Sequence, residues 1–194
     1  MTRLAADTTA DDRRALGLEL ADRVIGAARG AGLEVIIVTA DAAVRGWASG
    51  ASVRVVAEPP SGGLDHAAAT GVASASSGPW IVVHSDLPAI TPDDLVVAAE
   101  HAERGIVLAP SHDGGTPLVG AAGGSFPFRY GPGSFRRHLA AVRGRASILI
   151  RPGLALDLDR PWDLDALIGL GHLRPPTTAP AEDPRVSGGR LTPR

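Results

Sequence analysis

Three aspartates stand where carboxylates could hold a metal ion. Asp86 follows the apolar run WIVVHS, and Asp157 and Asp159 alternate with leucines in the stretch LALDLDRPWDL, residues 154–164. In an extended chain, side chains two residues apart point to the same side, about 6.5–7 Å apart along the strand. Two like charges on one face cost stability unless a positive charge lies between them. Carboxylate oxygens without Cys or His partners suit Mg²⁺, so the three residues indicate a magnesium site.

The residues alone leave simpler interpretations open for these acids. Asp86 also fits a turn or a helix-capping aspartate, although the proline after Leu87 favours a rigid, specifically placed carboxylate. The pair in residues 154–164 also fits a solvated strand edge with one aspartate paired to Arg160. The convergence of acids from separate strand ends is what favours the metal site.

A second constellation is typical of anion binding. The turn Gly131–Ser134 in FPFRYGPGSFRRHL brings a hydroxyl and free amides to the start of a predicted helix. A helix N-terminus binds phosphate or carboxylate because its first N–H groups are unpaired and its dipole is positive there. Arg136, Arg137 and His138 lie in the first turn and could add charge. Thr116, in the Gly-rich turn SHDGGTPL, is another candidate phosphate ligand. An ordinary loop with its serine as N-cap is the alternative.

The residues and motifs that several other chemistries require are absent from the sequence. All 19 basic residues are arginine and there is no cysteine, so Schiff-base and P-loop lysines, thiolate metal sites and disulfides are excluded. No G-x-S-x-G elbow and no H-E-x-x-H spacing occur among the residues. The glycines of GAARGAG end a helix and precede a strand, which is the reverse of a dinucleotide fingerprint.

The composition limits the number of domains, the classes of partner and the cellular location that we expect. With 194 residues, 44% of them hydrophobic, the chain fits one domain with a sizeable core. A net charge of −2 gives no electrostatic case for nucleic acid or an anionic membrane. No apolar run reaches the roughly 20 residues that span a bilayer, and no secretory pattern opens the chain. We therefore expect a soluble cytoplasmic protein.

Apolar periodicity predicts the elements that must position these residues. Buried-type strands alternate with helices, which implies a mostly parallel mixed α/β sheet with helices on both faces and ligands at the strand carboxyl ends. Residues 1–173 are expected to form this single domain, and the Pro- and Gly-rich residues 174–194 a disordered tail. The predicted helices cover residues 9–30, 41–48, 64–75, 134–142 and segments starting at Thr91 and Pro161, and the predicted strands cover residues 33–39, 53–58, 80–86, 104–110, 117–122 and 147–152.

Taken together, these segments resemble one family. The chain from about residue 2 to residue 173 is similar to the 2-phospho-L-lactate guanylyltransferases of deazaflavin coenzyme F-420 biosynthesis, including bacterial enzymes that take phosphoenolpyruvate. The motifs that carry the resemblance lie in the family's order and spacing. They are TRLA (2–5), GLDHA (63–67), SDLPAI (85–90), DGGTPL (113–118), FPFRYGPGSFRRH (126–138) and PGLALDLDRPWDL (152–164).

The resemblance implies a Rossmann-like nucleotidyltransferase fold, GTP as nucleotide, Mg²⁺ as cofactor, and phosphoenolpyruvate or 2-phospho-L-lactate as acceptor. It also assigns roles to ten residues. Those implied to hold magnesium are Asp86, Asp157 and Asp159. Those implied to cradle the acceptor's phosphate are Thr116, Gly131 and Ser134. On the nucleotide, Arg3 would face the triphosphate, and Gly63, Leu64 and Asp65 would lie near the nucleoside.

Two departures from the family pattern bear on function. Family members have a first strand and a loop ending in lysine before TRL, where this sequence has Met1. We therefore expect a sheet that lacks one central strand. Either the start of the sequence is assigned too late, or the protein has lost catalysis. Asp65 replaces a usual asparagine, which could weaken GTP binding or alter base choice. A molybdopterin-type or sugar-nucleotide transferase and a degenerate ligand-binding homologue are the alternative functions.

Overall fold

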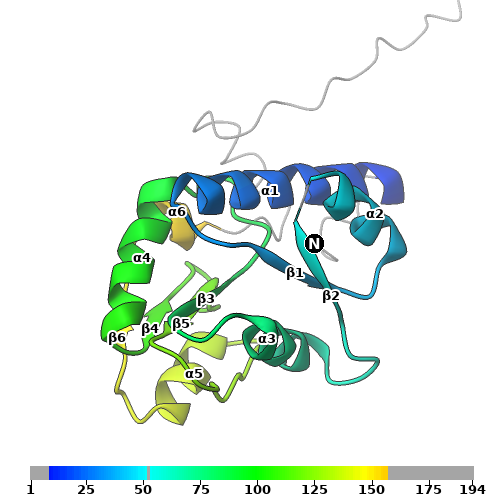
Figure 1. Ribbon diagram of the computed structural model, residues 1–194. Coiled ribbons are helices and arrows are strands. Elements are labelled where there is room, and N and C mark those ends of the chain that lie inside the picture. The colour runs from blue at the N-terminus through cyan, green and yellow to red at the C-terminus, as the bar shows by residue number, and fades with distance from the viewer. Residues whose placement is uncertain (1–8, 52, 157–194) are drawn as a thin grey trace, which may run out of the picture.

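A computed structural model of the protein describes residues 9–51 and 53–156, along which helices and strands alternate (Figure 1). This alternation confirms the α/β class. The helices are α1 (Ala10–Gly30), α2 (Ala42–Gly50), α3 (Gly63–Ser74), α4 (Pro92–Arg104), α5 (Ser134–Ala141) and α6 (Pro152–Ala155). The strands are β1 (Ile36–Thr39), β2 (Arg54–Ala57), β3 (Trp80–Val83), β4 (Val107–Ala109), β5 (Leu118–Ala121) and β6 (Ser147–Ile148).

Within the described residues, the strands form two sheets. β1 and β2 pair in parallel. The larger sheet has the order β3-β5-β4-β6, in which β5 is antiparallel to both neighbours and β6 is parallel to β4. β3, β4 and β6 therefore run in one direction and β5 in the other, so the sheet is mixed, as predicted, but two of its three strand pairs are antiparallel rather than parallel. The two sheets meet at α3, which contacts both β1 and β3.

Alternation along β4 and β5 sends side chains into two cores, one on each face of the larger sheet. Val107 and Leu118 pack with α1, α4 and α6, whereas Leu108 and Val119 pack on the opposite face with Ala68 of α3. In Figure 1, α1 and α4 accordingly lie on one side of this sheet, and α3 and α5 on the other. Successive side chains of a strand point to opposite faces of the sheet, so one short strand contributes to both cores.

The start of α4 follows its sequence signal. Thr91 is the N-cap, its hydroxyl accepts from the Asp94 amide, and the Asp94 carboxylate accepts from the Thr91 amide. Pro92 occupies the first helical turn, where its missing N–H has no cost. This capping box fixes the helix that lies beside the end of β3 and α6.

The predicted strand over residues 147–152 is confirmed only at its start. β6 ends at Ile148, and Pro152–Ala155 forms the helical turn α6, so Leu154 is helical rather than extended. The reason is tertiary, because Arg151 is held by ion pairs to the N-terminus of α4 and Pro152 then starts a turn. Extended backbone returns at Leu156, with φ −109° and ψ 107°.

Several predictions lie outside the described residues. These are Arg3, Asp157, Asp159, the helix expected from Pro161 and the tail 174–194. Within the described part, no helix combines the length and apolarity needed to cross a membrane.

Candidate active site at one edge of the sheet

The strand directions bring several loops to the same edge of the larger sheet. Val83 at the end of β3 and Ala109 at the end of β4 both lie opposite Leu118 at the start of β5. Asp86 therefore leaves the sheet at the edge where Thr116 enters it. A hydrogen bond of 2.9 Å from the His84 amide to the Pro117 carbonyl extends the pairing toward this edge. This is the edge at which ligands bind in open α/β sheets.

One carboxylate oxygen of Asp86 lacks a hydrogen-bond donor among the described residues. Its side chain is 23% exposed, but Oδ1 is buried and has no hydrogen-bond partner among the described residues. His84 Nδ1 lies 3.9 Å from Oδ1, and this contact is an ion pair only when the ring is protonated. A buried carboxylate oxygen without a donor is costly, and a hard cation would satisfy it. Asp86 thus fits a magnesium ligand.

The other two predicted metal ligands, Asp157 and Asp159, cannot be placed, since they lie beyond the described residues. Among residues 9–51 and 53–156, no three His, Cys, Asp or Glu side chains form a group that could hold a metal. The chain does approach the candidate site just before them. The His112 amide, in the loop between β4 and β5, donates to the Ala155 carbonyl at 3.0 Å.

The predicted anion-binding turn is formed by glycines in left-handed conformations. Gly131 has φ 109°, and Gly133, the N-cap of α5, has φ 65°. Ser134 is therefore the first helical residue rather than the cap, and no side chain caps α5. Its hydroxyl lies instead 3.1 Å from Thr116 Oγ1, and both residues are buried. The alternative of an ordinary serine cap is wrong, and two predicted phosphate ligands are brought together.

The loop that carries Thr116 is tied to this helix start. Asp113 Oδ1 accepts from the Gly115 amide at 2.9 Å and from the Ser111 hydroxyl at 2.6 Å, which makes a compact turn. The Phe135 amide in α5 donates to the Gly114 carbonyl at 3.2 Å. The hydroxyl pair is thus held by backbone contacts between two segments far apart in sequence.

His138 does not add positive charge to the turn, contrary to the expectation for the first turn of α5. It is fully buried, and the Arg129 amide donates to its Nε2 at 2.7 Å while its Nδ1 lies 2.9 Å from Thr116 Oγ1. Burial lowers the pKa of His138 to about 4, against the opposing effect of the Asp65 carboxylate. The ring is therefore neutral at pH 7. Arg137 turns back to the Tyr130 carbonyl at 2.6 Å, and Arg136 is exposed.

The depressed pKa of His138 predicts a pH-dependent stability. An unfolded chain binds a proton at this ring near the ordinary pKa of 6.5, whereas the folded chain does so only near pH 4. The unfolded state thus binds more protons between these values, and the free energy of unfolding falls as the pH decreases from 6.5 toward 4. The free energy of unfolding, measured with denaturant at pH 7, 5.5 and 4.5, should fall less steeply with decreasing pH for His138→Asn than for the natural protein. An equal or steeper decline in the variant would contradict this assignment.

The segment expected near the nucleoside opens α3 directly after β2. Gly62, with φ 103°, is its N-cap, and Leu64 is half exposed in the first turn. Asp65 Oδ1 accepts from the Tyr130 amide at 2.7 Å. The residue that departs from the family's asparagine therefore binds the chain that leads into the acceptor turn. An asparagine side-chain oxygen could accept the same bond.

Sequence reasoning missed the contacts that place α6 and Leu156. Arg151 Nε donates to Asp94 Oδ1 at 2.7 Å, and its Nη2 pairs with Asp93. Asp94 is 3% exposed, so this ion pair is partly desolvated. The acidic start of α4 was visible in the sequence, but its partner lies 57 residues away from Asp94. No local pattern connects them.

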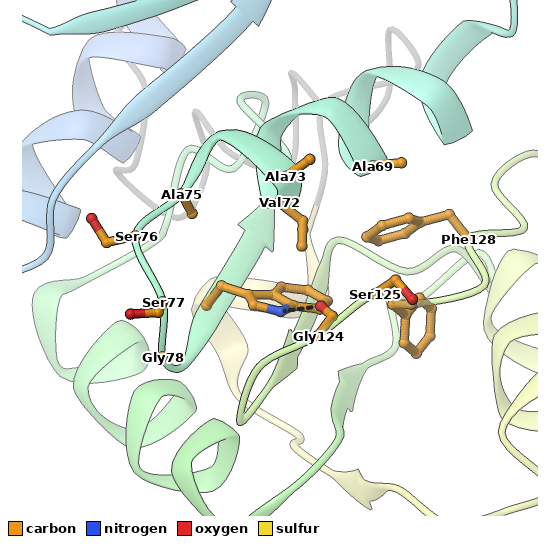
Figure 2. A pocket seen from close by; sticks show the side chains of 12 residues that line it. Ala69, Val72, Ala73, Ala75, Ser76, Ser77, Gly78, Gly124, Ser125 and Phe128 are labelled. Carbon is orange, nitrogen blue, oxygen red and sulfur yellow. Dashed lines mark hydrogen bonds between the residues drawn. The ribbon is translucent and has the colours of Figure 1, made fainter.

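A cavity of about 280 Å³ lies at the other end of β3 (Figure 2). It is lined by the end of α3, the following loop, Trp80 and the segment Gly124–Phe128. Its lining holds no charged side chain, and the Trp80 indole N–H already donates to the Gly124 carbonyl at 2.9 Å. The lining does include the hydroxyls of Ser76, Ser77 and Ser125, but it has no carboxylate for the counter-cation of a phosphate, so we place the reaction site at the Asp86 edge instead.

Comparisons with known proteins identify the family to which the chain belongs. The family model described as guanylyl transferase CofC like matches residues 1–172. A phosphoenolpyruvate guanylyltransferase of Sphaerobacter thermophilus is 36% identical over 183 residues, covering 87% of this chain and 86% of the relative. A 3-phospho-D-glycerate guanylyltransferase of Phenylobacterium zucineum is 36% identical over 176 residues, covering 84% of this chain and 81% of the relative.

One solved structure supports the fold. A protein from Desulfovibrio desulfuricans G20, described as a nucleotide-diphospho-sugar transferase, matches with a TM-score of 0.72 and 18% sequence identity. The match covers 88% of this chain and 80% of the other. At this identity the likeness concerns the nucleotidyltransferase-type fold alone.

Proposed function

Because the chain belongs to the guanylyl transferase family described as CofC like, we propose that it transfers GMP from GTP to the phosphate of a small phosphorylated acid, releasing pyrophosphate. The observation that carries the proposal is the pairing of Thr116 and Ser134 at the edge where Asp86 Oδ1 lies without a hydrogen-bond partner in the described part of the chain. Hydroxyls and helix-start amides suit a phosphate, and the carboxylate suits its counter-cation.

Phosphoenolpyruvate and 2-phospho-L-lactate are our first acceptor candidates, in the biosynthesis of coenzyme F-420. Two relatives are named for phosphoenolpyruvate and for 3-phospho-D-glycerate. All three acids carry a phosphate and a carboxylate on a three-carbon skeleton. The turn Gly131–Ser134 accounts for the phosphate that they share, so this turn supports the class of acceptor rather than one member.

The reaction that fits this site is an in-line displacement. An oxygen of the acceptor phosphate attacks the α-phosphorus of GTP, a new P–O–P bond forms, and the bond to pyrophosphate breaks. The acceptor phosphate is ionised at pH 7, so it needs no general base. His138 is accordingly not placed to act as a base, because the Arg129 amide donates to its Nε2 and the ring stays neutral. The protein's contribution is then mostly positioning and charge stabilisation.

Asp86, with Asp157 and Asp159, would hold a magnesium ion. That ion would neutralise charge that develops on the α-phosphate. Arg3 would face the triphosphate, and Gly63, Leu64 and Asp65 would lie toward the nucleoside. These roles are proposals that rest on the family resemblance and, for Asp86, on a buried oxygen that accepts no hydrogen bond from the residues the structure describes.

The experiment that tests this function measures pyrophosphate release by the full chain with GTP and Mg²⁺. We expect release only when phosphoenolpyruvate, 2-phospho-L-lactate or 3-phospho-D-glycerate is added, and a GMP adduct of that acid by mass spectrometry. Equal release without acceptor would contradict the mechanism. Release only with a sugar phosphate or a molybdopterin would establish the alternative transferase class, and no release with any of them would indicate a degenerate homologue.

Removing the Ser134 hydroxyl should affect one substrate selectively. A hydrogen bond to a charged group contributes about 1.5–3 kcal/mol, so Ser134→Ala is expected to raise the acceptor KM roughly 10- to 100-fold. The KM for GTP should change little. Steady-state kinetics with each substrate varied would measure this, with Ser125→Ala at the uncharged cavity as the matched control. Equal increases in both KM values would contradict the assignment.

A further inference from the structure

His138 stands at the inner end of a chain of hydrogen bonds whose direction is fixed. A backbone amide can only donate, so the Arg129 N–H, 2.7 Å from Nε2, makes that nitrogen an acceptor. Burial excludes the doubly protonated ring at pH 7, as its lowered pKa indicates. The single ring proton therefore resides on Nδ1. That N–H donates to Thr116 Oγ1, 2.9 Å away.

The direction of this chain decides where the hydroxyl hydrogens go. Thr116 and Ser134 together carry two hydroxyl hydrogens, and one of them closes the 3.1 Å bond between the oxygens. Because the ring N–H donates to Thr116, neither hydroxyl has to donate to His138. The second hydroxyl hydrogen can therefore be donated to a ligand. With the opposite tautomer, Thr116 would donate to the ring and Ser134 to Thr116. No hydroxyl hydrogen would then remain for an anion.

We propose that His138 is a positioning residue that keeps one hydroxyl hydrogen of the Thr116–Ser134 pair directed at the acceptor's phosphate. It does so without touching substrate and without carrying charge. The identity of the anion rests on the proposed function, whereas the direction of the hydrogen-bond chain does not. The segment Arg129–Tyr130 thereby takes part in acceptor recognition through its backbone, since it sets the tautomer and is itself held by Asp65.

The first test reads the tautomer directly and needs no activity. A long-range ¹H–¹⁵N correlation spectrum of the full ¹⁵N-labelled chain at pH 7 reports which ring nitrogen carries the proton, with His138→Gln identifying the signal by its loss. We expect a neutral ring protonated at Nδ1. A ring protonated at Nε2, or a charged ring, would overturn the proposal even if the protein proves to be a guanylyltransferase.

Two substitutions then separate the ring's two contacts. The amide of Asn can occupy the place of Nδ1 and donate to Thr116, while the amide of Gln can occupy the place of Nε2 and accept from Arg129. We expect His138→Gln to raise the acceptor KM about 10-fold, the effect of one lost bond to a charged ligand, with kcat and the KM for GTP nearly unchanged. His138→Asn should keep the acceptor KM within about 3-fold but lower the unfolding temperature more than the Gln variant.

A purely structural role gives a different pattern, in which the acceptor KM of both variants rises in step with their loss of unfolding temperature. That pattern, or an unchanged acceptor KM in His138→Gln, would overturn the proposal. Calorimetric titration with phosphoenolpyruvate alone supplies the same comparison without turnover. If the natural protein binds phosphoenolpyruvate but releases no pyrophosphate, the proposed function fails while the positioning role of His138 is still decided. If His138→Gln does not fold, the tautomer measurement decides it, with the His138 signal identified by its loss in His138→Asn.

Discussion

Asp86→Asn is expected to lower acceptor-dependent pyrophosphate release about 10³-fold, because a metal ligand supports several kcal/mol of transition-state charge stabilisation. Folding should be almost unaffected. Asp86 Oδ1 has no hydrogen-bond partner among the described residues, so the amide loses no hydrogen bond at that oxygen, only the 3.9 Å approach to His84 Nδ1, and it removes a partly buried charge that is otherwise costly. We expect an unfolding temperature equal to or slightly above that of the natural protein, measured by calorimetry in parallel with the rate.

The control for this prediction is the same chemical change at an exposed aspartate. Asp22 lies on the exposed side of α1, and Asp22→Asn should retain full activity. Activity of Asp86→Asn within 10-fold of the natural protein would remove the metal role assigned to this carboxylate. A large drop in its unfolding temperature would show that Asp86 is structural instead.

Gly153→Ala should have the largest effect on stability, about 2–4 kcal/mol, because it inserts a methyl group where the chain is already in contact. A Cβ at this position would overlap Asp94 Oδ2 and lie 2.8 Å from the Ala89 carbonyl. Asp94 cannot move aside cheaply, since it is buried and binds both Thr91 and Arg151. The backbone carbonyl is equally fixed. Thermal unfolding should shift downward by roughly 5–15 °C.

An identical substitution elsewhere provides the matched control. Gly46 lies inside α2, is exposed, and has no atom within 4 Å of an added Cβ. Gly46→Ala is expected to stabilise the protein by up to about 1 kcal/mol through helix propensity. If both variants shift in the same direction, the close packing of Gly153 against Asp94 does not limit stability. We also expect Gly153→Ala to lose activity, because α6 precedes the segment that carries Asp157 and Asp159.

Much of the fold followed from local patterns. The β-branched runs and the alternation of strands with helices predict the α/β class, and Thr91, Pro92 and Asp94 predict the start of α4. The stretch after Ile148 did not follow, because the apolar run SILIRP predicts a strand over residues 147–152, whereas Arg151 pairs with a distant helix and Pro152 starts a turn. Local propensity was overridden there by a tertiary ion pair.

The candidate site was predictable only in its parts. Gly131–Ser134 and Thr116 were identifiable as anion-binding residues from their types, but their 3.1 Å contact depends on how α5 meets the loop before β5. His138 was misjudged, because its sequence position beside two arginines suggests charge while its face of α5 is buried. The bond between Asp65 and the Tyr130 amide joins residues 65 positions apart and leaves no local signal.

We propose that Asp86 and the Thr116–Ser134 pair belong to one metal- and phosphate-binding site. Mn²⁺ in place of Mg²⁺, added with GTP to the ¹⁵N-labelled chain, broadens amide signals near the bound ion. We predict broadening at Asp86, Thr116 and Ser134, none at Gly78 and Ser125 around the uncharged cavity, and loss of the pattern in Asp86→Asn. Broadening centred on Gly78 and Ser125, or the same pattern in the Asp86→Asn variant, would contradict the account.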